Sequence, residues 1–324
     1  QQAAVEHPTY DAFWAERDST AALANVDIPV YLACDWDNVP VHLAGTFSTW
    51  SALARNPNVY LTLLPSGGLN RPWESLHYEA LAWYDHWLKD ADTGIAERPR
   101  VRYFLPGAGE WRTADQWPPA ESAIVEYALR PDGTLRPDVG GVGSRAYLRM
   151  TDESGRPRNA NTPQLPDRLH WHTPLVTEAL ELAGNIELRL EATITALDTA
   201  WIAVLYDIGP DGRATVVSAG WLRAMLRDVD ERNSTQGAPV VPCHRPSAVP
   251  VGEPVTYRIP LVPTARRIET GHQLRLTLTS GDDGKGAPTV LGFRHAPLGG
   301  SSLNTVHSGS RLLLPVVPAS ADRR

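Results

Sequence analysis

Hydrophobic residues in the first 90 positions alternate between strand-like and helix-like patterns. Residues 27–34 form a short, almost continuous apolar run with β-branched side chains, which predicts a strand covered on both faces. The spacing of apolar residues predicts a helix over 41–56, a buried strand over 58–64 and a long helix over 74–90. Such alternation of strand and helix is typical of a parallel sheet in an α/β fold.

The pattern changes after residue 100. Residues 99–119 predict an edge-like strand that runs into Gly and Pro turns, and no convincing helix follows. Alternating apolar residues over 185–194 and 272–280 predict half-buried antiparallel strands, and 310–318 predicts a closing strand. Roughly 200 residues of strands and turns predict a β-sandwich of the jelly-roll type.

The expected fold is therefore α/β plus all-β, in two domains. The boundary is predicted near residue 120, after Pro118 and Pro119, which gives domains 1–120 and 121–324. Two buried strands are too few for the first domain, because both edges of such a sheet and much of its faces would be bare. We therefore expect a segment on the N-terminal side to complete it.

Composition narrows the classes of partner. A net charge of −7 at pH 7 disfavours nucleic acids and anionic membrane surfaces, and no apolar run approaches the length of a membrane span. The two cysteines, Cys34 and Cys243, predict neither a disulfide framework nor a zinc signature. The first residues lack a signal-peptide pattern, but the chain does not begin with Met, so its location stays open with the cytoplasm favoured.

Several segments resemble one enzyme family in order and spacing. HPTYDAFWAERD (7–18), WYDHWLKDADTGI (83–95) and residues 99–119 resemble the cocaine esterase and X-Pro dipeptidyl-peptidase family of serine hydrolases, CocE/NonD. WIAVLYDIGPDGRA (201–214) and NTVHSGSRLLLPVVP (304–318) resemble the C-terminal jelly roll of that family. The resemblance implies the C-terminal portion of an α/β-hydrolase with a jelly roll, acting on a small-molecule ester or amide without a cofactor.

The resemblance also implies that the nucleophile lies in another segment. No serine in the chain has glycine at both −2 and +2, as a nucleophile elbow requires. Ser66, Ser144, Ser301 and Ser302 sit near glycines, but in predicted loops. An N-terminal α/β-hydrolase half, from the same precursor or a separate chain, is therefore the expected partner, and homo-oligomerisation stays open.

The predicted strand 27–34 is followed by Asp35, Trp36, Asp37 and Asn38. At this point the family has a pattern that resembles Trp-x-Asp. Aligned on Trp36, that pattern puts the triad acid at Asn38, and an asparagine can orient an imidazole but cannot balance its charge. We predict Asp37 as the catalytic acid, with Asp35 as the second choice. The alternative is that these residues cap the next helix or solvate the strand end.

The family histidine lies in a loop that resembles Thr-His-Gly, about five residues before a Trp-Glu pair. Counted back from Trp73, that position is Gly68. We predict His77 as the catalytic base, and its alternative is a partly buried polar residue on a helix face. Trp36 and Trp73 are predicted to line the substrate pocket.

Other motifs are weaker. The HWH run at 170–172 puts two imidazoles on one face, but the sequence places no third ligand, so no metal site is predicted. The acidic glycine-rich run 281–286 has neither phosphate-loop nor calcium-hand spacing and is expected to be a connection between strands.

The departures at Asn38 and Gly68, together with the absent elbow, keep a second function open. The chain would then be a catalytically inactive subunit or binding module of the same fold. A lectin-like role is a third alternative, based on jelly-roll analogy alone.

Overall fold

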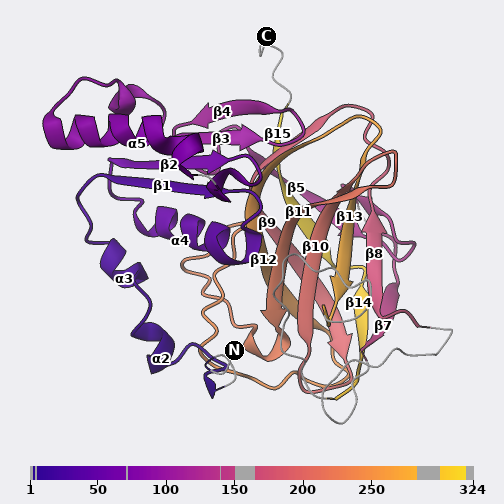
Figure 1. Ribbon diagram of the computed structural model, residues 1–324. Helices are drawn as coiled ribbons and strands as arrows, with labels where there is room; N and C mark the ends of the chain where they lie inside the picture. The colour runs from indigo at the N-terminus through magenta and orange to yellow at the C-terminus, as the bar shows by residue number, and fades with distance from the viewer. Residues whose placement is uncertain are drawn as a thin grey trace.

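The computed structural model describes residues 3, 6–70, 72–138, 140–149, 165–282 and 300–318 (Figure 1). Its strands form two sheets, one with four strands and one with eleven. Figure 1 shows the smaller sheet with its helices beside the upper part of the larger, strongly curved β-structure. The acid-bearing strand end predicted from the sequence lies in the smaller sheet.

The smaller sheet has the strand order β1-β2-β3-β4. Its strands are β1 (Val30–Asp35), β2 (Val59–Leu64), β3 (Val101–Leu105) and β4 (Glu110–Ala114). Strands β1, β2 and β3 are parallel, and β4 is antiparallel to β3. Both predicted strands are present, and the predicted burial is confirmed for β2, which is buried along its whole length, whereas in β1 the last two residues, Cys34 and Asp35, are buried and the first four are half-buried.

The prediction of one edge-like strand over 99–119 is wrong. The segment forms two strands, and β3 lies inside the sheet between β2 and β4. Its alternate residues Val101, Tyr103 and Leu105 are buried, and this period-2 pattern allows one face to join the core while the backbone pairs on both sides.

Helices cover both faces of the smaller sheet. The predicted helix 41–56 is shorter in the structure, where a π-helical turn η1 (Val39–Leu43) leads into α4 (Ala44–Ala52). The predicted helix 74–90 is α5 (Pro72–Lys89). The described residues before position 100 also form α2 (Ala12–Ala15), α3 (Thr20–Leu23) and the 3₁₀ turns η2 (Gly68–Asn70) and η3 (Ile95–Glu97).

Different side chains hold α4 and α5 to opposite faces. Phe47 of α4 joins a core shared with Leu61 and Leu63 of β2, whereas Trp83 of α5 packs with Tyr60 and Ile95. Because successive side chains of a strand point to opposite faces, Tyr60 and Leu61 of β2 serve the two layers.

The larger sheet runs β6-β5-β15-β9-β12-β11-β10-β13-β8, with β14 pairing β9 and β7. Its strands are β5 (Ala123–Leu129), β6 (Leu135–Arg136), β7 (Ser144–Arg149), β8 (Arg168–His172), β9 (Leu180–Ile194), β10 (Ala200–Ile208), β11 (Ala214–Arg223), β12 (Val255–Ile268), β13 (Gln273–Thr279), β14 (Ser302–His307) and β15 (Arg311–Val317). Strands β9, β13 and β15 confirm the three that the sequence predicted. In the described part of the chain beyond residue 100, the one helical segment is the 3₁₀ turn η4 (Ala224–Leu226).

The two sheets share a hydrophobic core. Leu61 and Tyr103 of the smaller sheet belong to the same buried cluster as Ile202, Val204 and Val262 of the larger sheet. The change of sheet falls between β4 and β5, and the division at residue 120 stays a prediction. Burial of one continuous apolar cluster holds the end of β1 rigidly against the larger sheet.

Candidate functional site

The carboxyl end of β1 carries a buried carboxylate. Asp35 is 1% exposed, and its Oδ2 accepts a hydrogen bond of 2.9 Å from the backbone N–H of Leu69. Its Oδ1 accepts from the Nδ2 of Asn38. One oxygen of Asp35 therefore connects the end of β1 to the turn that follows it, and the other connects it to η2. The position predicted for the family histidine, Gly68, lies in η2.

The two neighbouring residues point in different directions. Asp37 is exposed. Trp36 is 8% exposed, its Nε1 donates a 2.7 Å hydrogen bond to the carbonyl of Phe104, and its ring lies near those of Phe47 and Trp117. The indole of Trp36 thus lies in the core between the sheets, and its predicted substrate-binding role stays a prediction.

The predicted base lies on α5. His77 is exposed, and its ring centroid lies 3.8 Å from that of Tyr78. Within the described part of the chain, no hydrogen bond or ion pair joins His77 to Asp37 or Asp35. Trp73 is in the first turn of α5, and its side chain lies outside what the structure describes. The roles of Asp37 and His77 stay predictions.

A cavity of about 430 Å³ opens beside β1. It is lined by Leu32, Ala33, His42, Gly45, Thr46, Thr49 and Leu69. His42, in the π-helical turn η1, was missed by the sequence analysis, although it follows the polar break at the end of β1 by only four residues. The imidazole of His42 and Leu69 of the η2 loop thus both line this cavity at the edge of the smaller sheet.

Replacing Asp35 by Asn tests the connection between β1 and η2. The amide of Asn keeps one acceptor oxygen and replaces the other with an N–H donor, so one of the two N–H groups that donate to Asp35 loses its acceptor. We therefore expect the free energy of unfolding to fall by about 1–3 kcal/mol. The exposed Asp37→Asn is the control and should change it by less than about 0.5 kcal/mol. Urea unfolding measures both, and equal losses would contradict the structural role of Asp35.

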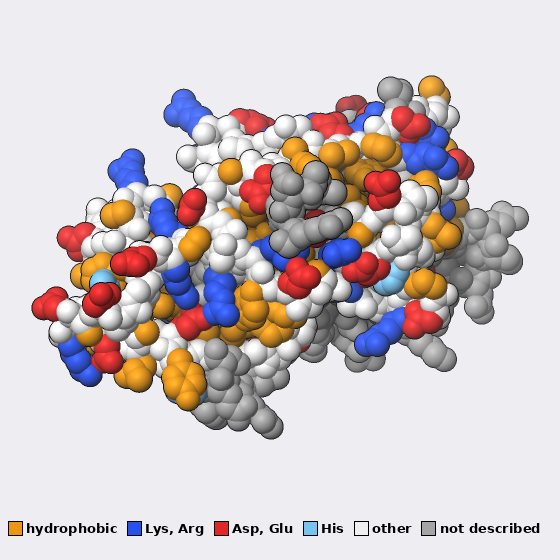
Figure 2. Space-filling model, turned by 90° about the horizontal axis from the view of Figure 1, so that it is seen from above, with side chains coloured by type: hydrophobic (Ala, Val, Ile, Leu, Met, Phe, Trp, Pro, Cys, Tyr) orange, Lys and Arg blue, Asp and Glu red, His pale blue; other side chains and the backbone are white. Residues whose placement is uncertain are grey.

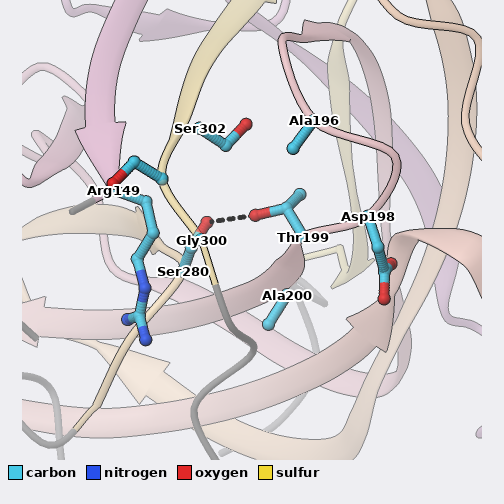
Figure 3. A pocket seen from close by; sticks show the side chains of 9 residues that line it. Arg149, Ala196, Asp198, Thr199, Ala200, Ser280, Gly300 and Ser302 are labelled. Atoms are coloured by element: carbon cyan, nitrogen blue, oxygen red, sulfur yellow. Dashed lines mark hydrogen bonds between the residues drawn. The ribbon is translucent and has the colours of Figure 1, made fainter. Parts of the chain in front are cut away.

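The serines near glycines do not form a nucleophile site in the described residues. Ser66, Ser144 and Ser301 are exposed, whereas Ser302 is buried and donates a 2.7 Å hydrogen bond to Asn304. Figure 3 shows a small cavity near Ser302 in which Thr199 donates to Ser280 at 3.1 Å. No histidine lines this cavity among the described side chains, and the Ser280 hydroxyl also accepts a 2.9 Å hydrogen bond from the Nδ2 of Asn304.

The HWH run lies on β8. The rings of His170 and His172 are parallel, with centroids 6.3 Å apart, on the face opposite to the buried Trp171. In the described ranges, no group of three or more His, Cys, Asp or Glu side chains gathers as metal ligands would. The run 281–286 lies mostly outside the described residues. No described helix has the length and apolar character needed to span a membrane.

Comparison with known proteins identifies the family. Residues 93–309 match the model of the X-Pro dipeptidyl-peptidase C-terminal non-catalytic domain. The chain belongs to the CocE/NonD family, the cocaine esterase and X-Pro dipeptidyl-peptidase-like hydrolases.

Individual relatives agree with this assignment. A protein from Mycobacterium bovis named "Putative serine esterase Mb1866c" is 30% identical over an alignment of 280 positions that covers 78% of this chain and 43% of the relative. Cocaine esterase from a Rhodococcus species is 21% identical over an alignment of 362 positions, gaps included, that covers 97% of this chain and 60% of the enzyme. This chain therefore spans about half the length of these relatives.

Solved structures show the same fold. A CocE/NonD family hydrolase from Staphylococcus aureus superposes with a TM-score of 0.80 at 19% identity, over 98% of this chain and 59% of that chain. An α-amino acid ester hydrolase superposes with a TM-score of 0.75 at 19% identity, over 97% of this chain and 60% of that chain. The chain thus has the C-terminal architecture of the family, and the matched domain is a non-catalytic one.

Proposed function

We propose that this chain is the C-terminal part of a serine hydrolase that cleaves a small ester or amide by acyl transfer to water. In this proposal an N-terminal half, from the same precursor or a separate chain, supplies the nucleophile. Residues 1–120 are then the late strands and final helix of an α/β-hydrolase domain, and 121–324 are a jelly roll. The family assignment and the share of its relatives that the chain covers support this reading.

The observation that carries the proposal is the outer edge of β1. This parallel strand stands at the end of the smaller sheet, and no strand in the described ranges pairs with its outer side. Parallel sheets are normally covered on both faces and at their edges, because exposed N–H and C=O groups and apolar side chains invite pairing. A further strand from an N-terminal half would fit this edge.

The outer face of α5 supports the same arrangement. Tyr78, Leu81, Tyr84 and Leu88 are between 55% and 75% exposed. Figure 2 shows hydrophobic side chains among charged ones on the part of the molecule that contains α5. An apolar strip of this kind on a helix that already packs on the sheet is typical of a face that another element covers.

In the proposed mechanism, a serine of the N-terminal half attacks the carbonyl carbon of the substrate. An imidazole takes the serine proton and later delivers it to the leaving group, while a carboxylate orients and stabilises the imidazolium. Asp37 and His77 remain our proposed acid and base. Their exposure at the described surface leaves both side chains accessible to an added half-domain.

A second candidate, a catalytically inactive subunit, is favoured by the hydrogen bonds of Asp35. Its two oxygens are bound by Asn38 and Leu69, so this buried carboxylate already has a structural role. Gly68 stands where the family pattern has its histidine. In this candidate the chain completes the fold and the binding surface of its partner without supplying the acid or the base.

Intact mass analysis of the natural material under denaturing conditions decides whether a second half is present. We expect either a longer chain or a co-purifying polypeptide of roughly 200–300 additional residues, the size of a half-domain with a cap. A serine-directed fluorophosphonate should label that segment, and a p-nitrophenyl ester should be hydrolysed. A single polypeptide with the mass of this 324-residue chain, not labelled by the fluorophosphonate, would contradict the proposal of a hydrolase.

Substitution of Asp37 in the active assembly separates the two candidates. If Asp37 is the acid, Asp37→Asn should lower kcat by up to about four orders of magnitude, as in the serine-protease triad that supplies this figure. Asp18→Asn is the control, because Asp18 lies outside the smaller sheet, in the segment between α2 and α3. This variant should leave kcat unchanged. Full activity of Asp37→Asn and of His77→Gln would remove both residues from the mechanism.

A further inference from the structure

A row of polar side chains crosses three strands of the larger sheet. Arg275 of β13 pairs directly with His172 of β8 on one side and with Tyr206 of β10 on the other. Directly paired residues in antiparallel strands project on the same face, so the three side chains lie side by side. The adjacent residue Leu276 points the other way and is fully buried in the core of the larger sheet.

Within the described residues, the guanidinium of Arg275 has no hydrogen-bond acceptor. Its Nε is buried and has no hydrogen-bond partner, and in the described part of the chain no carboxylate forms an ion pair with it. Its Cζ lies 4.7 Å from the centre of the Tyr206 ring. Stacking holds the group in place but satisfies none of its five N–H donors, which is costly for a charge that is partly removed from water.

The surroundings of Arg275 are cationic. Arg145 of β7 lies over the ring of Trp171 and donates to the carbonyl of His170, and Arg168 stands at the start of β8. Among the described residues, the carboxylates beside this group are Asp167, which pairs with Arg168 and is 64% exposed, and Asp132, whose charge acts on Arg145. In the described ranges, neither of these two carboxylates forms an ion pair with Arg275.

The two imidazoles respond to this charge. Burial, followed by the charges of Arg275, Arg168, His172 and Arg145, lowers the pKa of His170 to about 4. Burial, Arg275 and Arg145 also lower the pKa of His172. Both rings are therefore neutral near pH 7, and the Nδ1 of His170 lies 2.9 Å from the hydroxyl of Thr277.

We propose that the face formed by His170, His172 and Arg275 binds an oxyanion, namely a carboxylate or phosphate group. The oxygens of the bound anion would accept charge-assisted hydrogen bonds from the N–H groups of Arg275. The negative charge of the anion would also offset the positive charge of the neighbouring arginines. Two imidazoles on one strand face also suit a transition metal, but the guanidinium beside them repels a cation. The proposal is independent of acyl transfer.

The test is an NMR titration of the histidine ring protons in the intact chain, in chloride, acetate and inorganic phosphate at constant ionic strength. A bound anion stabilises imidazolium, so we expect a saturable rise of about 1 in the pKa of His170 and His172. His307, which lies 2.7 Å from the Thr193 hydroxyl on β9, is the internal control and should not respond. A response to phosphate alone assigns a phosphate ligand, and a response to acetate as well assigns a carboxylate.

Arg275→Gln provides the decisive variant. Removal of the charge should raise the pKa of both histidines in chloride and abolish the response to added anion, while Arg213→Gln in the turn before β11 should behave like the unchanged chain. If Arg275→Gln disturbs the fold, the histidine spectrum in chloride will show it, and the unchanged chain still decides. No saturable response to either anion, or the same response in Arg275→Gln, would overturn the proposal.

Discussion

Replacement of Glu187 by Ala is expected to lower the free energy of unfolding by about 3–5 kcal/mol, the range found when one partner of a buried ion pair is removed. Glu187 of β9 is fully buried, and its carboxylate accepts from the Nε and Nη2 of Arg258 at 2.7 and 3.1 Å. It also accepts a 3.1 Å hydrogen bond from the backbone N–H of Gly237. Loss of the carboxylate leaves the guanidinium of Arg258 and this N–H group without their buried acceptor.

The same arginine provides a matched control. Arg258 also pairs with Glu231 at 2.7 Å, but the Glu231 side chain is 70% exposed. Because water screens an exposed pair, Glu231→Ala should cost less than about 1 kcal/mol. Chemical denaturation of the two variants measures the difference, and equal costs would show that burial of Glu187 is not what makes its pair important.

The second large effect is expected at Trp36. Trp36→Ala removes a buried indole from the core between the sheets and should cost about 3–5 kcal/mol, because the cavity left behind collapses only in part. The variant also leaves the carbonyl of Phe104 without the Nε1 donor of Trp36. Thermal unfolding followed by circular dichroism measures the loss.

Trp111 on β4 is the control for Trp36. Its side chain is 38% exposed and packs at the surface against Phe104 and Arg102. Since much of this ring already contacts water, Trp111→Ala should cost about 1 kcal/mol or less. If the two variants unfold alike, Trp36 does not anchor the sheets to each other.

The hydrophobic pattern was sufficient for most strands and helices. Continuous apolar runs identified β1 and β2, and alternation identified β9 and β13, because burial on two faces and on one face leave different periods in a sequence. The segment 99–119 was misjudged. Its Gly107 and Gly109 indicated the turn correctly, but whether β3 pairs on one side or two depends on β2, more than 30 residues away.

The candidate site was predictable only as a location. The run from Asp35 to Asn38 indicated a polar strand end, but it did not show which carboxylate is buried. That depends on the η2 loop, whose Leu69 N–H binds Asp35 and leaves Asp37 exposed. His42 was missed because its place beside the cavity results from the π-helical turn η1, which a helix-period pattern does not indicate.

The sequence by itself determined the alternation of strand and helix, the change to antiparallel strands, and the family. It also determined the departures at Asn38 and Gly68, since residue identities need no coordinates. Only the tertiary structure decided that β3 is internal, that Trp36 lies between the sheets, and that the buried Nε of Arg275, between His172 and Tyr206, has no acceptor among the described residues. These facts depend on contacts between distant segments, and local periodicity carries no information about which distant strand becomes a neighbour.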